Sequence, residues 1–313
     1  MHPGKRIFYL LVFIACLVAC DSQTEKPLRV GTIPWAGYET LYLARELNYY
    51  DSHRIQLKEL TSSTELLHGF RQGQLDAIAV TLDEALRLAE TQANVKIVLI
   101  FNISNGADKL ITEPTIDSLA DLQGKRIAVE QSGVGKLMLM HILKRAKLDY
   151  EDIIIVPSTI NQHLEMLTTH QVDAAITFDP IAQRLQQMGY NNLIDSRQFP
   201  DEIIDVLVIR DTSLKLHSKA IKQLLKGYWK ARDYLDNNYQ ESLEIMAPRL
   251  GITPEELNNS YQDLILPSHD SHQAIMEQKI SAIIDSMSHV MMNFGLLQKP
   301  AVTSQLLMNQ NRH

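Results

Sequence analysis

The chain has 313 residues, of which 45% are hydrophobic, and its formal charge is −7. A chain of this length can bury a large core, either as one domain or as two lobes. The acidic balance argues against binding to nucleic acid, and against binding to anionic lipid by charge.

The first 19 residues are predicted to be a signal peptide. Lys5 and Arg6 precede the apolar run from Ile7 to Val18. This run has the length of a signal-peptide core and is too short for a comfortable membrane span. The run ends in Leu17-Val18-Ala19-Cys20, which resembles the lipobox of bacterial lipoproteins. We therefore expect an exported protein that is anchored to the membrane by lipid on Cys20.

Removal of the signal changes both the cysteine content and the charge. Cys16 leaves with the signal and Cys20 carries lipid, so no thiol remains for a disulfide, a zinc site or a nucleophile. Loss of Lys5 and Arg6 from the 30 basic residues leaves 28 against 37 acidic ones, a formal charge of −9. Asp21 directly after the cysteine favours retention on the periplasmic face of the inner membrane, and residues 20–27 are expected to be a tether.

Strands and helices alternate in the first part of the mature chain. Strands are predicted at Leu28 to Ile33, Ile55 to Leu60, Ala77 to Val80 and Val95 to Phe101. Pro34 to Gly37 is expected to be a turn, and Tyr38 to Leu47 the first helix. Two later helices begin with predicted capping boxes, in which Ser62 precedes Glu65 and Thr81 precedes Glu84. This order predicts a parallel sheet covered by helices on both faces.

A second alternating unit follows residue 107. Its predicted strands are Lys109 to Thr112, Arg126 to Glu130, Ile153 to Val156, Ala174 to Thr177 and Ile203 to Ile209, and its predicted helices include Ser118 to Leu122, Gln162 to Thr169 and one begun by Asp179-Pro180. Everything after Ser213 is expected to be helical, with a helix start at Thr253 and no further strand. We expect two lobes, 28–107 with 206–313 packing back on it and 108–205, joined by two extended strands that form a hinge.

The stretch from Gly124 to Met140 joins a strand to a helix through a glycine turn. The backbone N–H groups of such a turn can hold an oxygen of a ligand. A nucleotide-binding P-loop is excluded, because Glu130 and Leu137 stand where that motif needs Gly and Ser or Thr. Ser132 could instead be only a helix N-cap, and both interpretations stay open from the sequence.

The opening motif of the mature chain resembles a known family. Val30 to Glu39, followed by Leu41 to Leu47, is similar to the start of the substrate-binding proteins of ABC importers in the nitrate, sulfonate, taurine and thiamine-precursor group. Later motifs match the same group: Gly73-Gln74-Leu75-Asp76-Ala77, Leu119 to Lys125, and Val172-Asp173-Ala174-Ala175. The resemblance implies a type II periplasmic-binding-protein fold that closes on one small molecule and delivers it to an ABC permease in the inner membrane.

The resemblance also indicates where the ligand binds, in loops at the edges of the two sheets. The positions carried over are Trp35, Gly37, Tyr38, Glu39, Thr81, Asp83, Asn105, Asp108, Gln131, Ser132, Gly133, Val134, Phe178, Asp179 and Asp205. Carboxylates and aromatic side chains dominate this set, and Lys136 is the only base near the glycine turn. A nitrate or bicarbonate site would need more positive charge. A cationic, zwitterionic or heteroaromatic amine is the expected ligand.

Each of these positions also has a purely structural interpretation. Thr81 and Asp83 could do no more than start a helix, Asp179 could be an N-cap, and Tyr38 and Phe178 could belong to the lobe cores. His269 and His272 lack a third metal ligand nearby in the sequence, so no metal site is predicted, and no cofactor is expected.

Three other functions compete with transport as interpretations of the sequence. An enzyme like the thiamine-precursor synthases is disfavoured, because the chain has no cysteine-rich motif of their kind and no activated nucleophile. A lipoprotein that presents its ligand to a membrane sensor remains an alternative. A LysR-type regulator would carry a helix-turn-helix where this chain has a signal peptide. A monomer with no nucleic-acid partner is expected.

Overall fold

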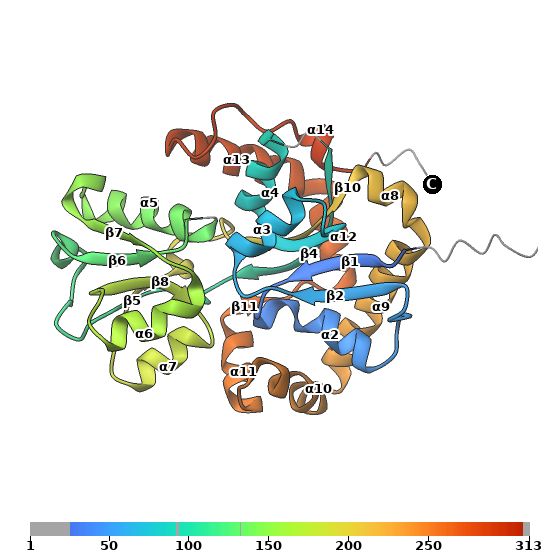
Figure 1. Cartoon of the computed structure of the whole chain (residues 1–313), viewed down its shortest axis with the longest axis horizontal. Coiled ribbons are helices and arrows are strands. Elements are labelled where there is room, and N and C mark those ends of the chain that lie inside the picture. The colour runs from blue at the N-terminus through green and yellow to red at the C-terminus, as the bar shows by residue number, and fades with distance from the viewer. Residues whose placement is uncertain (1–25, 92–93, 132, 309–313) are drawn as a thin grey trace, which may run out of the picture.

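The structure is a computed structural model that describes residues 26–91, 94–131 and 133–308. It has two α/β lobes, which Figure 1 shows side by side, and a largely helical C-terminal region that packs beside the first lobe. The chain crosses to the second lobe after residue 104 and returns before residue 204. The predicted signal peptide, the lipid site at Cys20 and the turn residue Ser132 lie outside the described residues.

The first lobe is built on a six-stranded sheet of order β11-β4-β10-β3-β1-β2. Its strands are β1 (Leu28–Thr32), β2 (Ile55–Glu59), β3 (Ala77–Thr81), β4 (Val95–Ser104), β10 (Ile204–Arg210) and β11 (Leu264–Ile265). The sheet is mixed, because β10 returns from the second lobe and runs antiparallel to both β3 and β4. The prediction of a purely parallel sheet is therefore wrong.

The second lobe has a five-stranded sheet of order β7-β6-β8-β5-β9. Its strands are β5 (Asp108–Thr112), β6 (Arg126–Val129), β7 (Ile154–Pro157), β8 (Ala174–Phe178) and β9 (Asn191–Asp195). β9 was not predicted, since its residues are mostly polar and half-buried. β11 contradicts the prediction of no strand after Ser213: it has two residues and pairs with the end of β4.

The α-helices cover the two sheets and form most of the C-terminal region. They are α2 (Glu39–Glu46), α3 (Ser63–Arg71), α4 (Leu82–Thr91), α5 (Val134–Ala146), α6 (His163–Thr168), α7 (Ile181–Gln187), α8 (Asp211–Leu216), α9 (Ser218–Asn237), α10 (Tyr239–Met246), α11 (Pro254–Gln262), α12 (His269–Ala274), α13 (Ile280–Asn293) and α14 (Thr303–Leu306). A π-helical turn (Ile275–Lys279) links α12 to α13. Short 3-10 helices are η1 (Ala36–Tyr38), η2 (Leu119–Leu122), η3 (Tyr150–Asp152), η4 (Ile160–Gln162), η5 (Ser196–Gln198) and η6 (Ala247–Leu250).

Local sequence explains several of these helix starts. The Ser62 hydroxyl accepts a hydrogen bond from the Glu65 backbone N–H at 3.3 Å and caps α3. The Glu65 carboxylate accepts from Thr61 and not from the Ser62 backbone, so only half of the predicted capping box forms. Thr253 and Glu256 form the capping box of α11, with Pro254 at its first position. None of the helices in the described ranges has the length and apolar character needed to cross a membrane.

The larger core belongs to the first lobe and reaches into the C-terminal region. Tyr38, Phe101 and Tyr228 stack edge to face, with ring centroids 5.2 and 5.6 Å apart. Since Tyr228 lies in α9, this column packs a C-terminal helix against strand β4 and the loop after β1. Such packing holds that loop in place at the junction of the lobes.

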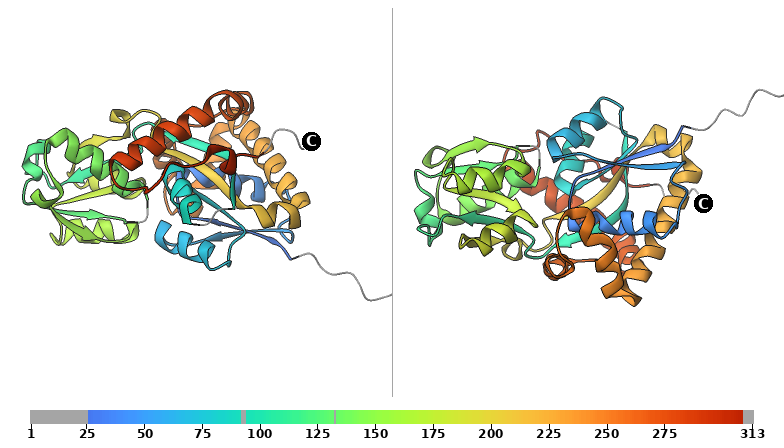
Figure 2. Two further views of the ribbon diagram at one scale, coloured as in Figure 1. Left: turned by 90° about the horizontal axis from the view of Figure 1, so that it is seen from above. Right: turned by 60° about the horizontal axis from the view of Figure 1, so that its bottom comes forward.

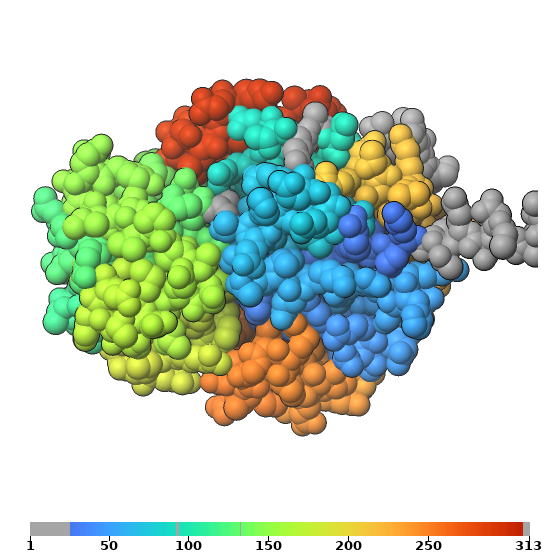
Figure 3. All heavy atoms as spheres, viewed as in Figure 1, coloured from blue at the N-terminus to red at the C-terminus, as the bar shows by residue number. Residues whose placement is uncertain are grey.

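The two lobes touch (Figure 3), and this arrangement is called the closed form. The Thr64 backbone N–H and hydroxyl in the first lobe donate to Glu130 Oε1 in the second, at 3.1 and 2.9 Å. Trp35 meets Phe178 edge to face, with ring centroids 4.9 Å apart. Side chains from the two lobes thus face one another across a buried interface.

Candidate functional site

Three polar side chains meet where the first sheet ends at the lobe interface. Asp205 in β10 pairs in the sheet with Thr81 of β3 on one side and with Asn102 of β4 on the other. All three are buried, with exposed fractions of 3%, 8% and 0%. Because β10 is the strand that returns from the second lobe, this register fixes Asp205 beside the hinge.

The loop after β1 supplies two hydrogen-bond donors to Asp205. Trp35 Nε1 donates to Asp205 Oδ2 at 2.9 Å, and Tyr38 Oη donates to Asp205 Oδ1 at 2.7 Å. A Cβ on Gly37 would lie 2.1 Å from Asn102 Nδ2, so only glycine leaves room for that buried amide. The structure brings together the predicted residues Trp35, Gly37, Tyr38 and Asp205.

Two carboxyl groups near the hinge have raised pKa values. Burial raises the pKa of Asp205 to about 7, and the hydrogen bond from Tyr38 opposes that shift. Burial also raises the pKa of Asp108, the first residue of β5, to about 6, and the charge of Asp179 adds to the effect. An ionised carboxylate is costly where water is excluded, so a positive charge placed nearby would favour the ionised form of both groups.

The start of α4 adds two further acids, each only 2% exposed. The Thr81 backbone N–H donates to Glu84 Oε2 at 3.1 Å, which agrees with the predicted capping role of Glu84. Burial raises the pKa of Asp83, and burial together with the charge of Asp83 raises the pKa of Glu84 well above its usual range. Glu84 also reaches the second lobe, because a Cβ on Gly133 would lie 2.1 Å from Glu84 Oε1.

The glycine turn of the second lobe faces these acids. Gly133 is the N-cap of the 13-residue helix α5 and Val134 is its first residue, while Gln131 is half-buried in the preceding turn. Unpaired backbone N–H groups at a helix start favour negative charge or an acceptor. The turn is therefore able to hold an acceptor, and its neighbour across the interface in this closed form is the Glu84 carboxyl.

Several buried polar atoms around the interface have no partner of ordinary geometry among the described residues. They are Thr81 Oγ1, Asp83 Oδ1, both atoms of the Asn102 amide and Thr177 Oγ1. The Asn102 side chain still lies close enough to the Asp205 carboxyl to favour its ionised form. The Thr81 side chain does the same for the Asp83 carboxyl. Buried polar groups without partners are costly, and a ligand that supplies the missing hydrogen bonds would remove that cost.

Two of the predicted ligand positions have other partners. Glu39 forms a close ion pair with Arg249 of η6, and Arg249 also pairs with Glu59 and stacks on the Tyr42 ring at 3.5 Å. Burial raises the pKa of Glu39 to about 7. Asn105 has an exposed side chain, and its backbone N–H donates to the Asp263 carbonyl at 2.9 Å. The buried amide near the hinge is therefore Asn102 and not Asn105.

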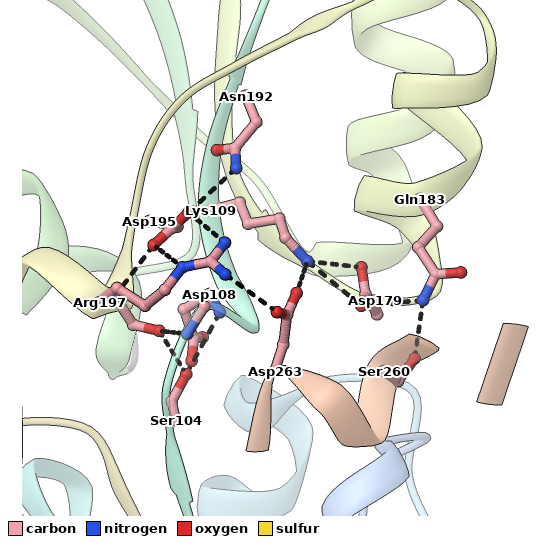
Figure 4. Close-up of polar contacts among 12 residues, drawn as sticks. Ser104, Asp108, Lys109, Asp179, Gln183, Asn192, Asp195, Arg197, Ser260 and Asp263 are labelled. Atoms are coloured by element: carbon pink, nitrogen blue, oxygen red, sulfur yellow. Dashed lines mark hydrogen bonds and ion pairs between the residues drawn. The ribbon is translucent and has the colours of Figure 1, made fainter. Parts of the chain in front are cut away.

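Asp179 belongs to a separate network between the second lobe and α11, drawn in Figure 4. Lys109 Nζ lies 3.2 Å from both Asp179 oxygens and 3.0 Å from Asp263 Oδ2. Gln183 Nε2 donates to Asp179 Oδ2 at 2.9 Å and to Ser260 Oγ at 2.8 Å. Asp179 does not cap α7, because that helix begins at Ile181 and the carboxylate faces Lys109. The predicted N-cap role of Asp179 is wrong.

His269 and His272 pack against an aromatic ring. Each imidazole meets the Trp229 ring edge to face at 4.9 Å. Burial lowers the pKa of His272 to about 4, so it is neutral at physiological pH. In the part of the chain that the structure describes, no group of three or more His, Cys, Asp or Glu side chains is arranged to hold a metal ion.

Several residues near the interface carry only partial signals in the sequence. The sequence predicts only a capping role for Glu84, although its carboxyl also touches the second lobe. Asn102 is a polar residue within the apolar strand β4, and that break in the pattern could have singled it out. Lys109 and Thr177 are paired residues in β5 and β8, which sequence alone does not place side by side.

Known proteins are similar to this chain over most of its length. A family model described as "NMT1/THI5 like" matches residues 35–242. A binding protein of Brucella abortus (strain 2308) is 24% identical over 301 residues, which cover 93% of this chain and 92% of the relative. This match spans nearly the whole chain.

Solved structures share the fold. The ligand-binding component of an ABC-type import system from Staphylococcus aureus, with zinc bound, has a TM-score of 0.76 and 14% identity, covering 90% of this chain and 96% of that one. The alkanesulfonate-binding protein SsuA from Xanthomonas axonopodis pv. citri bound to MOPS has a TM-score of 0.74 and 18% identity, covering 90% and 98%. The desulfurization enzyme DSZB has a TM-score of 0.65 and 16% identity, covering 90% and 96%. The predicted periplasmic-binding-protein fold is confirmed.

Proposed function

Since this chain belongs to the NMT1/THI5-like family, we propose that it is the solute-binding protein of an ABC importer. It would capture one small molecule between residues 28–107 and 108–205 and deliver it to a permease in the inner membrane. The support is the shared fold, together with a buried polar interface between two lobes that are joined by two strands. Solved structures of the same fold include the sulfonate-binding proteins SsuA, so we infer a binding role and not an enzymatic one.

The ligand is proposed to carry a positive charge. The observation that carries this proposal is the group of buried acids Asp83, Glu84, Asp108 and Asp205, none of which forms an ion pair with another described residue. An ammonium group or a protonated ring nitrogen among them would relieve their mutual repulsion. Trp35 and Phe178 offer aromatic edges and faces for such a cation or for a heteroaromatic ring.

The other end of the ligand is proposed to be a hydrogen-bond acceptor. It would take the place beside Gly133 and Val134 that the Glu84 carboxyl occupies in the closed form. A purely anionic solute, such as the alkanesulfonate that the Xanthomonas relative binds, would add to the negative charge already buried here. An amine, a zwitterion or a basic heteroaromatic compound is the better match to these residues.

A thermal-shift screen followed by calorimetry tests both parts of the proposal. The soluble chain beginning at Asp21 would be screened with amines, pyrimidines, polyamines and sulfonates, because a ligand that binds the folded state raises the melting temperature. Asp205→Asn should then weaken binding of an amine by about 2–5 kcal/mol. Asp179→Asn is the matched control, since its carboxylate is already paired with Lys109. Affinity within threefold of wild type for Asp205→Asn, or a preference for sulfonates, would falsify the cationic ligand.

Attachment to the membrane is part of the same proposal. The motif ending in Cys20 implies a lipid anchor at the periplasmic face of the inner membrane, where a permease would be within reach. Metabolic labelling with a fatty-acid probe should label the wild-type protein and not Cys20→Ala. Equal labelling of the two proteins would contradict the anchor and leave the binding function untouched.

A further inference from the structure

A second cavity lies away from Asp205, between the second lobe and the C-terminal region. Its volume is about 480 Å³, and its walls are α5, the segment after η5 and the end of α13. Figures 1 and 2 show α13, in red, running from above the first lobe toward the second. Small-molecule sites have volumes of about 300 to 1,000 Å³, so this cavity is large enough for a ligand.

One wall of the cavity is aromatic and is shared by three segments. The His141 ring in α5 stacks on Phe199 at a centroid distance of 4.7 Å and a tilt of 34°. Phe294, directly after α13, meets the same ring edge to face at 5.0 Å and 89°. Val290 adds an aliphatic surface beside them. This wall offers a flat apolar molecule good contacts and gives a highly hydrated ion little to bind.

The rim of the cavity is positively charged. Lys144 and Arg145 lie on α5, and within the described residues no ion pair reaches either of them. Arg145 donates to the Gln198 carbonyl at 3.2 Å and lies 5.7 Å from the Phe199 ring centroid, which orients its guanidinium over the aromatic wall. Glu202 is the one acid among the lining residues, and it forms a close pair with His141. The cavity is thus basic in a chain whose formal charge is −7.

We propose that this cavity is a second binding site, for a small anion with a flat apolar body such as an aromatic carboxylate. The half-buried rings of His141 and Phe294 would hold the body, and Lys144 and Arg145 would hold the carboxylate. This site would prefer an anion, whereas the lobe interface is proposed to prefer a cation. Probes of opposite charge therefore distinguish the two sites.

Occupancy of the cavity should favour the closed form. Its walls belong to the second lobe and to the end of α13, and the loop after α13 is tied to the first lobe by the Gln298 backbone N–H, which donates to Glu90 Oε1 of α4 at 2.7 Å. A molecule that contacts both sides stabilises the arrangement in which they are close together. By linkage, it would raise the affinity of the lobe interface for its own ligand.

Calorimetry with 2-naphthoate on the soluble chain tests the site. Saturable binding of 2-naphthoate is expected. In the Asp205→Asn variant, in which the proposed cation site at the lobe interface is weakened, 2-naphthylmethylammonium, which has the same rings and the opposite charge, should show no comparable binding. The double variant Lys144→Gln/Arg145→Gln should lose affinity by about tenfold or more, because two charge-assisted contacts are removed. Lys147→Gln/Lys219→Gln removes the same charge outside the cavity and is the matched control.

Further variants separate this site from the lobe interface. Phe294→Leu should weaken 2-naphthoate binding, and Asp205→Asn should leave it within twofold of wild type. The proposal is overturned by any of three results: no saturable heat at millimolar 2-naphthoate, equal affinity in the Lys144→Gln/Arg145→Gln variant and its control, or loss of binding in Asp205→Asn alone. Lys144 and Arg145 are exposed, so their replacement should not unfold the protein, and a melting curve checks this.

Discussion

Two groups of carboxylates lie near the hinge and differ in what balances their charge. Asp179 and Asp263 face Lys109, at 3.2 and 3.0 Å, and Asp179 also accepts a hydrogen bond from Gln183. Asp205 and Asp108 form no ion pair with another described residue, and burial raises the pKa of both. The first group is balanced by the protein itself, whereas the second is left to be balanced by a proton or by a ligand.

The contrast shows what each group does. The balanced group joins β5 of the second lobe to α11 and the residue after it, so its charges hold the closed structure together (Figure 4). The unbalanced group makes the closed form costly while it is empty and ionised. Asp179 is as buried as Asp205 and Asp108, whereas the side chain of Asp263 is 20% exposed, and what sets Asp179 and Asp263 apart is that each forms an ion pair with Lys109.

The largest effect is expected from breaking the balanced group. Lys109→Met should lower the free energy of unfolding by about 3–5 kcal/mol, because Asp179 would remain buried without its partner. Urea denaturation followed by circular dichroism measures this loss. Arg197→Gln is the control: that side chain is 50% exposed where it pairs with Asp195 and Asp263, so the expected loss is about 1 kcal/mol or less. Equal losses in the two variants would show that Lys109 is not the balancing charge.

The sequence predicted the fold better than the balance of charges within it. Periodicity and caps located β1, β3, α3 and α11, because those signals are local. The family resemblance placed Trp35, Tyr38 and Asp205 at one site, and the structure brings these three into hydrogen-bond contact. Strands β9 and β11 were missed, because one is mostly polar and the other has only two residues.

The roles of individual acids could not be predicted, since they depend on contacts between distant segments. Glu39 meets Arg249, which lies 210 residues further along the chain, and Asp179 meets Lys109 across 70 residues. No local pattern distinguishes these paired acids from Asp205, whose carboxylate accepts hydrogen bonds from Trp35 and Tyr38 and forms no ion pair with another described residue. A carboxylate at a sheet edge therefore indicates a ligand site only if no cationic side chain of the protein pairs with it.

The next effect is the pH dependence of the ligand-free protein. The pKa of Asp205 is about 7 in the folded chain and that of Asp108 about 6, both above the ordinary value of 3.8. Their neutral forms are favoured by folding, so their contribution to stability is full below about pH 4 and is lost as the pH rises toward about 7. Unfolding free energy should fall by a few kcal/mol between these limits, as urea curves at several pH values would show.

Asp205→Asn should remove much of this pH dependence, because an amide cannot ionise. Asp179→Asn should keep the part that Asp205 contributes and should lower stability at neutral pH, since Lys109 loses a charged partner there. A wild-type protein that grows more stable from pH 5 to pH 8 would contradict the unbalanced group. The two amide variants thus distinguish Asp179, whose charge stabilises the fold, from Asp205, whose ionisation destabilises it.

Binding of a cation should show the opposite pH trend. An ammonium group favours the ionised forms of Asp205 and Asp108, so protons must leave before it binds. Affinity for any amine found in the screen should rise by about tenfold or more between pH 5 and pH 8, with release of protons to the buffer. Calorimetry in two buffers of different ionisation enthalpy measures both quantities. Affinity that is independent of pH would show that the amine does not bind beside Asp205 and Asp108.

The smallest effect concerns the closed form itself, where Thr64 of α3 reaches Glu130 of the second lobe. Thr64→Val removes the hydroxyl that donates to Glu130 Oε1 at 2.9 Å and leaves the backbone N–H bond at 3.1 Å in place. One hydrogen bond contributes about 0.5–1.5 kcal/mol, so the balance should move measurably toward the open form. Small-angle scattering of the ligand-free protein should then give a larger radius of gyration.

Thr61→Val is the matched control, because Thr61 Oγ1 donates at 2.8 Å to Glu65 within the first lobe, and this hydrogen bond does not cross the lobe interface. If both variants scatter like wild type, the contact between Thr64 and Glu130 does not hold the lobes together, and the balanced charges around Lys109 would have to do so alone.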